Sequence, residues 1–205
     1  LQNRLYSAIY VVGTALSVSF VMTLFIIFYI KLGPVYPEYN RSRTVSMNYI
    51  TLEVNSDDGW FSSSRYGASQ NLCNLLREID GCEALATHCG GHSYSFTVNE
   101  IDNCDGRFVN NDFWRVYDFE FLAGKPFTDA DAHSPLVVVS ENFARQLFAT
   151  ADVVDREINI NNTRNRIVGV VKSPGGCTPD CYSQFWIPAA HSLLNNEKAG
   201  HSIVG

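Results

Sequence analysis

The feature that most constrains this chain is a long stretch without any charged side chain, from Tyr6 to Ile30, in which Val, Ile, Leu and Phe dominate. At about 1.5 Å per residue, a helix of this length crosses a hydrocarbon core of about 30 Å. A secretory signal peptide has a shorter apolar segment that ends in a small-residue cleavage site, and neither feature precedes Lys31. The sequence therefore predicts a transmembrane helix over residues 6–30.

The remainder of the chain has the length of one ordinary domain. Gly33, Pro34 and Pro37 break the helix, and the polar run from Glu38 to Thr44 is typical of a short linker. We therefore expect a linker over residues 31–45 and a folded domain over residues 46–205. Because the chain begins with Leu1 rather than Met, we also expect it to be part of a longer product.

Charge argues against a nucleic-acid partner. All 21 acidic residues lie beyond the apolar stretch, and from Leu32 onward they are accompanied by only 13 basic residues without a basic cluster. Binding to nucleic acid depends on clustered Lys and Arg that displace counterions. We therefore expect no nucleic-acid binding.

Two signals disagree about the compartment of the domain. Lys31, Arg41 and Arg43 follow the apolar stretch and only Arg4 precedes it, a bias that by itself favours a cytoplasmic domain. All six cysteines, however, lie beyond the stretch, and paired thiols are typical of oxidising compartments. We give the cysteines more weight and expect an extracytoplasmic domain.

The six cysteines permit fifteen pairings, which the sequence does not resolve. They are Cys73, Cys82, Cys89, Cys104, Cys177 and Cys181. Pro and Gly residues around the last two favour a small loop closed by a Cys177–Cys181 disulfide, although free thiols or metal ligands are the alternatives. We expect at least one oxidised pair among the six.

Alternating and helical patterns predict an α+β domain. The first unit has a strand at Ser46–Val54, a loop at Asn55–Ala68, and a helix that Ser69 caps and Gly81 ends. Two short strands are expected next, at Glu83–Thr87 and Tyr94–Val98. Such a strand, helix and strand usually bring two neighbouring strands together, with the helix packed on one face.

Short elements are expected next: a strand near Phe108, a helical turn at Asp112–Tyr117 and a turn at Gly124. A second group of regular elements follows them. Leu136–Val139 is predicted to be a central buried strand, with Val138 in the core, and Ser140 is placed to cap the following helix. Glu157–Ile160 and Arg166–Val171 are expected to form a hairpin. Asn161 and Asn162 would supply its turn.

Neither of two enzyme motifs is complete. Gly124-Lys125 is followed by Pro126, whereas a phosphate-binding loop needs Ser or Thr after the Lys and an earlier Gly. Gly91-His92-Ser93-Tyr94-Ser95 lacks the second Gly of a serine-hydrolase elbow. We therefore expect no catalytic residue, no bound cofactor and no ATPase activity in this chain.

Metal sites are also weakly supported. His88, Cys89 and His92 could bind zinc if they converged, but Gly90-Gly91 disfavours a helix, and we interpret the segment as a surface loop. Two acidic pairs, Asp57-Asp58 and Asp129 with Asp131, do not follow the oxygen pattern of a calcium loop. We expect no metal site and interpret these pairs as solvated turns.

Several segments in order carry a family resemblance. They are Phe108–Trp114, Phe121–Thr128, Val137–Phe148, Ile167–Val171 and Phe185–Pro188. Their order and spacing, behind one transmembrane helix, resemble the MacB-like periplasmic core domain of ABC transporter permeases. We identify no counterpart in that family for the segment from Asn55 to Cys104, and we expect the chain to end before the later part of the core domain.

The resemblance implies a permease subunit of the MacB/FtsX type in the inner membrane, with its large domain in the periplasm. It also implies several partners: a cytoplasmic ABC ATPase subunit, a second permease copy or homologue, membrane lipid, and a periplasmic or outer-membrane partner. The domain would transmit ATP-driven conformational change to an extracytoplasmic substrate or partner.

Two other classes stay open from the sequence. A membrane-anchored sensor or binding module would carry a signalling domain on the other side of the helix. A secreted, disulfide-rich enzyme would need a convergent polar pocket, which the sequence does not indicate.

Overall fold

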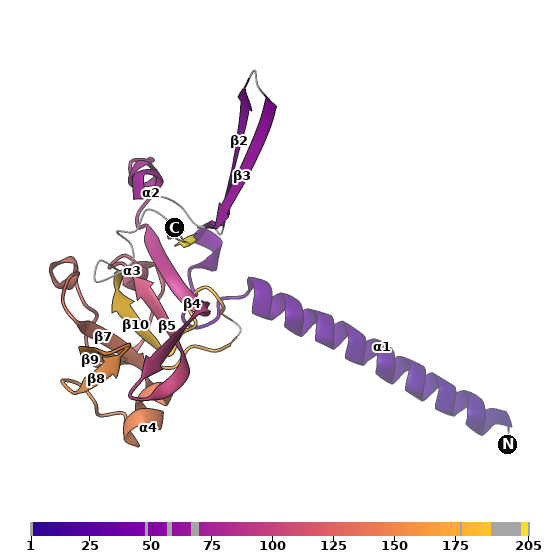
Figure 1. The fold of residues 1–205 in the computed structure, drawn as a ribbon. Coiled ribbons are helices and arrows are strands. Elements are labelled where there is room, and N and C mark those ends of the chain that lie inside the picture. The colour runs from indigo at the N-terminus through magenta and orange to yellow at the C-terminus, as the bar shows by residue number, and fades with distance from the viewer. Residues whose placement is uncertain are drawn as a thin grey trace. The chain divides into compact units, whose positions relative to one another are not determined.

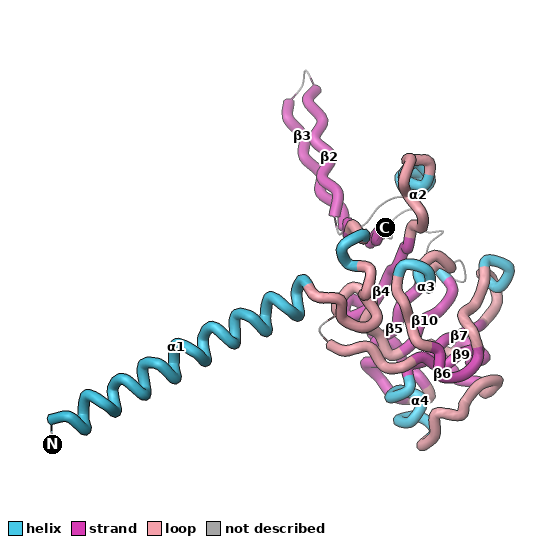
Figure 2. Tube along the Cα trace, turned by 180° about the vertical axis from the view of Figure 1, so that it is seen from behind, coloured by secondary structure: helices cyan, strands magenta, loops and turns pink. Residues whose placement is uncertain are grey.

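The computed structural model describes residues 2–47, 49–56, 59–66, 70–176, 178–189 and 202–204. The chain divides into two compact units, Leu1–Val35 and Tyr36–Gly205, each of which is described by itself. Figures 1 and 2 show the first as one long helix and the second as a mixed domain built around a sheet.

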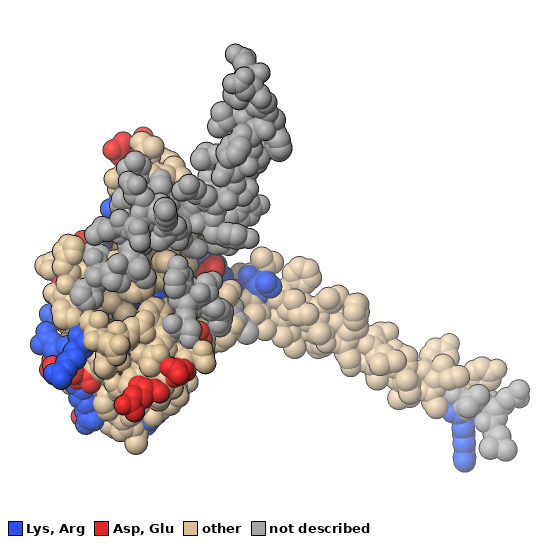
Figure 3. Space-filling view, in the orientation of Figure 1, with Lys and Arg blue, Asp and Glu red and all other residues tan. Residues whose placement is uncertain are grey.

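The first unit is the helix α1 (Gln2–Leu32). Its segment Tyr6–Leu32 is long and apolar enough to cross a membrane, and it contains the span predicted from the sequence. The sequence of α1 has no acidic or basic residue between Arg4 and Lys31, and the face of the helix seen in Figure 3 is uncharged between its two ends. A helix whose large side chains are apolar on all sides suits a lipid environment better than an aqueous one.

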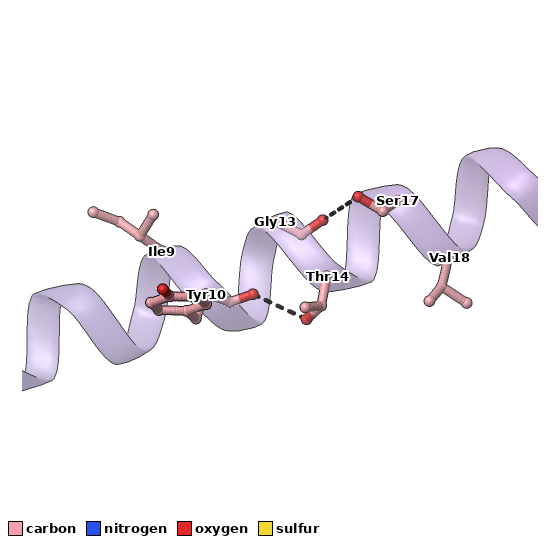
Figure 4. Close-up of a pocket in the computed structure, with 6 residues that line it drawn as sticks. All are labelled: Ile9, Tyr10, Gly13, Thr14, Ser17 and Val18. Carbon is pink, nitrogen blue, oxygen red and sulfur yellow. Dashed lines mark hydrogen bonds between the residues drawn. The ribbon is translucent and has the colours of Figure 1, made fainter.

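Three hydroxyl side chains of α1, those of Thr14, Ser17 and Thr23, bond to backbone carbonyls of the same helix. Thr14 Oγ1 donates to the carbonyl of Tyr10 at 2.9 Å, and Ser17 Oγ donates to that of Gly13 at the same distance (Figure 4). Because Gly13 has no side chain, a shallow groove lies between Ile9 and Val18. Satisfying hydroxyls on the backbone lowers the cost of placing them in hydrocarbon.

The second unit contains three α-helices and two short 3-10 helices among its described residues. The α-helices are α2 (Gln70–Arg77), α3 (Phe113–Val116) and α4 (Glu141–Phe148), and the 3-10 helices are η1 (Arg41–Arg43) and η2 (Asp129–Asp131). The strands are β1 (Ser46–Met47), β2 (Tyr49–Ser56), β3 (Gly59–Tyr66), β4 (Ala86–Val98), β5 (Ile101–Val109), β6 (Phe121–Gly124), β7 (Leu136–Ser140), β8 (Glu157–Ile160), β9 (Thr163–Val171), β10 (Phe185–Pro188) and β11 (Ser202–Val204).

Within the described residues, nine strands form one sheet in the order β1-β11-β4-β5-β10-β7-β9-β6. The ninth strand, β8, pairs with β9 and, through Val98 and Ile160, with β4. Successive pairings therefore close a ring of six strands, β4-β5-β10-β7-β9-β8. The β5–β10 and β7–β9 pairs are parallel, while the other pairs are antiparallel.

One hydrophobic core lies inside this ring. Every strand of the ring contributes to it, and Phe143 and Ala144 of α4 complete it. The side chains from the strands are Phe96, Val98, Cys104, Phe108, Phe185, Ile187, Val137, Val139, Ile167, Val170, Ile158 and Ile160. Because successive residues of a strand face opposite sides, the alternate residues of β7 are left for another core.

The second core lies on the outer face of the same strands. Leu136 and Val138 of β7 and Trp186 of β10 pack there against the aromatic residues of α3 and of the segment that follows it. The rings of Phe113, Trp114, Tyr117, Phe119, Phe121 and Phe127 belong to this group. Because β7 is buried on both faces, the predicted central position of this strand and the burial of Val138 are confirmed.

Local signals explain the elements around β7. The Ser140 side chain accepts a hydrogen bond from Phe143 N and caps α4, and the C-cap residue Ala149 adopts a left-handed conformation. Asn161 and Asn162 both have positive φ values, as a tight turn of type I′ requires, and they join β8 to β9. The predicted cap and hairpin are therefore confirmed, and β9 begins three residues earlier than expected.

Three expectations for the segment from Ser46 to Val98 are wrong. The expected strand Ser46–Val54 is divided between β1, in the main sheet, and β2, and the expected loop Asn55–Ala68 contains β3. β2 and β3 pair from Tyr49 with Tyr66 to Ser56 with Gly59 in a two-stranded sheet (Figure 1). The backbone pairing of β3 overrides the loop-like composition of its Ser residues.

The third correction concerns β4. Its thirteen residues replace the two short strands that we expected with a loop between them. The register against β5 shifts between Gly90 and Ser95, so the strand accommodates its Gly residues as an irregularity rather than breaking. The capping residue expected for α2, Ser69, lies outside the described residues. α2 ends at Arg77, and Gly81 has a φ of +95° in the turn that follows.

Candidate functional site

The segment from Tyr36 to Arg43, which we call the docked segment, opens the second unit of the chain. Only Gly33, Pro34 and Val35 separate it in sequence from the end of α1 at Leu32. It lies within the linker predicted for residues 31–45. Two sets of contacts join it to the body of the domain, and they involve residues far away in the sequence.

Tyr36 makes the first set of contacts. Its hydroxyl donates to the carbonyl of Lys172 at 2.9 Å and accepts from Glu120 N at 3.3 Å. Lys172 and Glu120 also pair with each other, through backbone atoms and through their charged side chains at 2.9 Å. The Tyr36 hydroxyl is thus held where the end of β9 meets the start of β6.

The ring of Tyr36 contributes packing to the same contact. It lies edge-on to Phe119 of the outer core, with centroids 6.1 Å apart, and Lys172 Nζ lies 5.3 Å from its centroid. Burial raises the pKa of the Tyr36 phenol to about 12. A neutral, hydrogen-bonded phenol with an apolar body is suited to anchoring a chain segment on a protein surface.

Glu38 makes the second set of contacts. Its Oε2 atom accepts from Arg41 Nε at 2.6 Å, and its Oε1 atom accepts from the buried thiol of Cys181 at 3.3 Å. Between the two sets, the carbonyl of Pro37 accepts from Asp118 N at 3.0 Å. The docked segment is therefore held at several successive residues.

Cys181 belongs to a loop that Arg107 of β5 fixes from the other side. The Arg107 guanidinium donates to the carbonyls of Pro179, Asp180 and Tyr182. Its Nη1 atom also lies 2.9 Å from His88 Nδ1 on β4. Burial lowers the pKa of Arg107 below its ordinary value, but a guanidinium with several well-placed acceptors keeps its charge.

Together these contacts form a continuous path from Glu38 through Cys181 and its loop to Arg107 in the sheet. Burial raises the pKa of Cys181, which lies on this path, and that of Tyr117 in the outer core. Three polar groups are buried: the Tyr117 hydroxyl and the indole N–H groups of Trp114 and Trp186. None of the three has a hydrogen-bond partner among the described residues. The arrangement is suited to holding a segment in place rather than to proton transfer or nucleophilic attack.

The motifs considered for enzyme chemistry lie in settings that do not suit it. Gly124 ends β6 with a φ of +71°, and no helix begins at Lys125 or Pro126, whereas a phosphate-binding loop opens a helix. Residues 91–95 lie within β4, so Ser93 does not stand on a strand-to-helix turn.

The segment His88 to His92, which we weighed as a zinc site and interpreted as a surface loop, is also part of β4. Its first two residues are buried, so the surface-loop interpretation is wrong. Within the described ranges, no three His, Cys, Asp or Glu side chains converge as metal ligands would. Asp131 instead completes a capping box with Thr128 at η2, whose hydrogen bonds lower the pKa of the Asp131 carboxyl. Asp57 and Asp58 lie outside the described residues.

The sequence favours a disulfide between Cys177 and Cys181, but the structure does not show one at Cys181. Cys181 carries a free thiol, which contacts Glu38 and the Thr178 carbonyl, and Cys177 lies outside the described residues. The side chain of Cys181 is turned into the domain toward the docked segment, which explains the difference.

The docked contacts gave little signal in the sequence. Glu38 is one charged residue in a polar run, and Cys181 lies 143 positions away from it. Arg107 was the one detectable residue, because a charged side chain between Gly106 and the apolar pair Phe108-Val109 is unusual in a buried strand.

The second unit combines a mixed sheet that has two hydrophobic cores with the docked segment, and it follows a helix long and apolar enough to cross a membrane. The model of the MacB-like periplasmic core domain matches residues 7–204. The chain belongs to this family, as the resemblance in its sequence had implied. No curated protein matches the chain.

Solved structures share the fold. The periplasmic region of MacB from Actinobacillus actinomycetemcomitans superposes with a TM-score of 0.53 at 16% identity, over 67% of this chain and 64% of that one. The extracellular domain of the noncanonic ABC-type transporter YknZ from Gram-positive bacteria gives 0.57 at 14% identity, over 78% and 83%. A domain assigned to a permease protein from Porphyromonas gingivalis gives 0.58 at 13% identity, over 82% and 73%. The chain thus spans less than two thirds of the MacB region.

Proposed function

We propose that the chain is the front part of a permease subunit of a MacB/FtsX-type ABC transporter, anchored by α1 in the inner membrane with its second unit in the periplasm. A cytoplasmic ABC ATPase subunit would drive it, and a second permease copy would complete it. The family assignment supports this proposal, together with a helix long and apolar enough to span a membrane.

In this proposal the domain transmits movement rather than carrying out chemistry. The observation that carries it is the docking of Tyr36, whose hydroxyl bonds to both Lys172 and Glu120 only four residues after α1 ends. Pro34 and Pro37 further restrict the backbone of this connection, because Pro fixes φ and limits the residue before it. A shift of the helix end would therefore reach β6 and β9 without passing through a flexible tether.

The test is a flexible insertion placed before the docked segment. A long Gly/Ser segment between Gly33 and Pro34 of the complete permease leaves the contacts of Tyr36 and Glu38 intact but separates them from α1, because such linkers behave as random coils. We expect transport-linked function to be lost, with expression and ATP hydrolysis retained. Normal function in this variant would contradict the proposal and would favour a tethered binding module.

A pair of substitutions tests the docking itself. Tyr36→Ala removes the ring and the hydroxyl, whereas Tyr36→Phe retains the ring against Phe119 and loses only the two hydrogen bonds. We expect function to fall in the order wild type, Tyr36→Phe, Tyr36→Ala at equal membrane levels. Val45→Ala is the control, because Val45 is 73% exposed and lies just after the docked segment. Equal function in Tyr36→Ala and Val45→Ala would show that the docking does not transmit movement.

A further inference from the structure

A small hydrophobic cluster attaches α2 to the rest of the second unit. Its buried members are Cys73 of α2 and Leu85, and the residues packed against them are Met47, Leu72, Leu76 and Cys82. Two cysteines thus share one apolar cluster. Both carry free thiols in the structure.

The chain path explains how the two cysteines come to the same cluster. After α2 ends at Arg77, Ile79 N donates to the Leu76 carbonyl, and Cys82 N donates to the Ile79 carbonyl. Gly81 completes the reversal with a φ of +95°, a backbone conformation that few other residues adopt without strain. These turns bring Cys82 to the cluster that also contains Cys73.

A helix of eight residues such as α2 is too short to be stable alone and depends on its attachment to the domain. Leu75 and Ile79 are 62% and 56% exposed, so only one side of this region is buried. The ion pair of Arg77 with Asp112 is 3.5 Å long and largely exposed, and such pairs contribute about 0–1 kcal/mol. A covalent link would be a substantial addition to this attachment.

We propose that Cys73 and Cys82 form a disulfide that fastens α2 to the turn before β4. The proposal rests on their shared cluster and on the reversed chain between them. It does not depend on transport, although it does require the domain to reside in an oxidising compartment.

The step is a thiol–disulfide exchange with a disulfide donor, such as an oxidised dithiol protein. The thiolate of Cys82, which is partly exposed, attacks one donor sulfur and releases the other as a thiolate, leaving a mixed disulfide on Cys82. The Cys73 thiolate then attacks the Cys82 sulfur and displaces the second donor thiol. The pair loses two protons and two electrons, and the donor disulfide is reduced to two thiols.

The order of attack follows from the two environments. Cys73 is 2% exposed, and burial raises the pKa of its thiol, so it is the poorer first nucleophile. Two other cysteines have separate surroundings: Cys104 lies in the core inside the ring of strands, and Cys181 lies against Glu38.

Peptide mapping of the chain isolated from the native envelope tests the pairing. After alkylation without reduction, trypsin and a Glu-specific protease cut after Arg65, Arg77, Glu78 and Glu83. Residues 66–77 then carry only Cys73, and residues 79–83 carry only Cys82. We expect these two peptides to be joined and to separate on reduction. Recovery of both as singly alkylated peptides, or joined to other cysteines, would overturn the proposal.

Thiol counting supplies a second readout that needs no native fold. If the two cysteines are paired, Cys73→Ser frees Cys82, and the number of thiols alkylated in denatured, unreduced protein rises by one. Cys82→Ser should give the same rise, and the double variant should restore the wild-type number. Cys104→Ser is the matched control and should lower the number by one. A fall of one in Cys73→Ser would show that Cys73 is unpaired.

Discussion

The thiol of Cys181 donates to Glu38 Oε1 at 3.3 Å, and this contact joins positions 143 residues apart in the chain. The second carboxylate oxygen of Glu38 holds Arg41 at 2.6 Å, so both oxygens have a partner in a nearly buried setting. The start of the domain is thereby fixed to the loop that Arg107 holds from the sheet.

Glu38→Ala should lower the free energy of unfolding by about 1–3 kcal/mol, because it leaves Arg41 and the Cys181 thiol without their acceptor in a partly buried site. Urea unfolding of the full chain in detergent, followed by Trp fluorescence, measures this loss. Glu83→Ala is the control. Its ion pair with Arg43 is exposed, so its loss should cost less than about 1 kcal/mol. Similar losses in both variants would contradict the importance of the Glu38 contact.

The stability of the domain should fall as the pH rises above about 9. Burial raises the pKa of Cys181 above its ordinary value of 9.0 and that of Tyr36 from 10.0 to about 12. Between the ordinary and the raised values, the unfolded chain loses protons that the folded chain keeps. The folded state then binds more protons, so the free energy of unfolding decreases with rising pH.

Unfolding midpoints measured from pH 8 to pH 11 check this expectation. Cys181→Ser removes the thiol contribution, so its midpoint should decline less steeply than that of the wild type just above pH 9. A wild-type midpoint that stays constant or rises over this range would show that these buried groups do not remain protonated in the folded chain.

Val138→Ala should cost about 2–3 kcal/mol, because Val138 is fully buried in the outer core and its shortening leaves a cavity beside Trp186. Leu122→Ala on β6 is the control, since this Leu is 46% exposed, and its shortening should cost less than about 1 kcal/mol. Unfolding in urea compares the two variants directly. A larger loss for Leu122→Ala would contradict the central position of β7.

Elements with strong local signals could be predicted from the sequence. The uncharged stretch from Tyr6 identified α1, four consecutive apolar residues identified β7, and the pair Asn161-Asn162 identified the β8–β9 turn. In each case the determining interaction lies within a few residues, so composition and period were sufficient.

Elements that depend on distant partners could not be predicted. The Ser-rich residues of β3 are strand only because β2 lies beside them, and Gly90 continues β4 because β5 provides its partner. The contacts of Tyr36 with Lys172 and of Glu38 with Cys181 depend on the assembled sheet. Contacts of this kind, made within the predicted linker by Tyr36 and Glu38, leave no local pattern in the sequence.

Arg107 is the residue for which a conservative change should have the largest effect. Arg107→Lys keeps the positive charge, but one ammonium group cannot replace a planar guanidinium that serves three carbonyls of the loop and His88 at once. We expect a loss of about 2–3 kcal/mol, since carbonyls at Pro179 to Tyr182 lose their donors. Hydrogen exchange should also accelerate at the amides of Cys181 and Tyr182, whose bonds to the Thr178 carbonyl depend on the shape of this loop.

Arg145→Lys provides the comparison. Arg145 pairs with Glu141 on the exposed side of α4, so a Lys at this position should retain most of the interaction and change stability by less than about 0.5 kcal/mol. Urea unfolding and hydrogen exchange of both variants separate a general effect of replacing Arg from the loss of the loop contacts. If Arg107→Lys left the exchange of Cys181 and Tyr182 unchanged, the loop would be held by other contacts, and Arg107 would not connect the docked segment to the sheet.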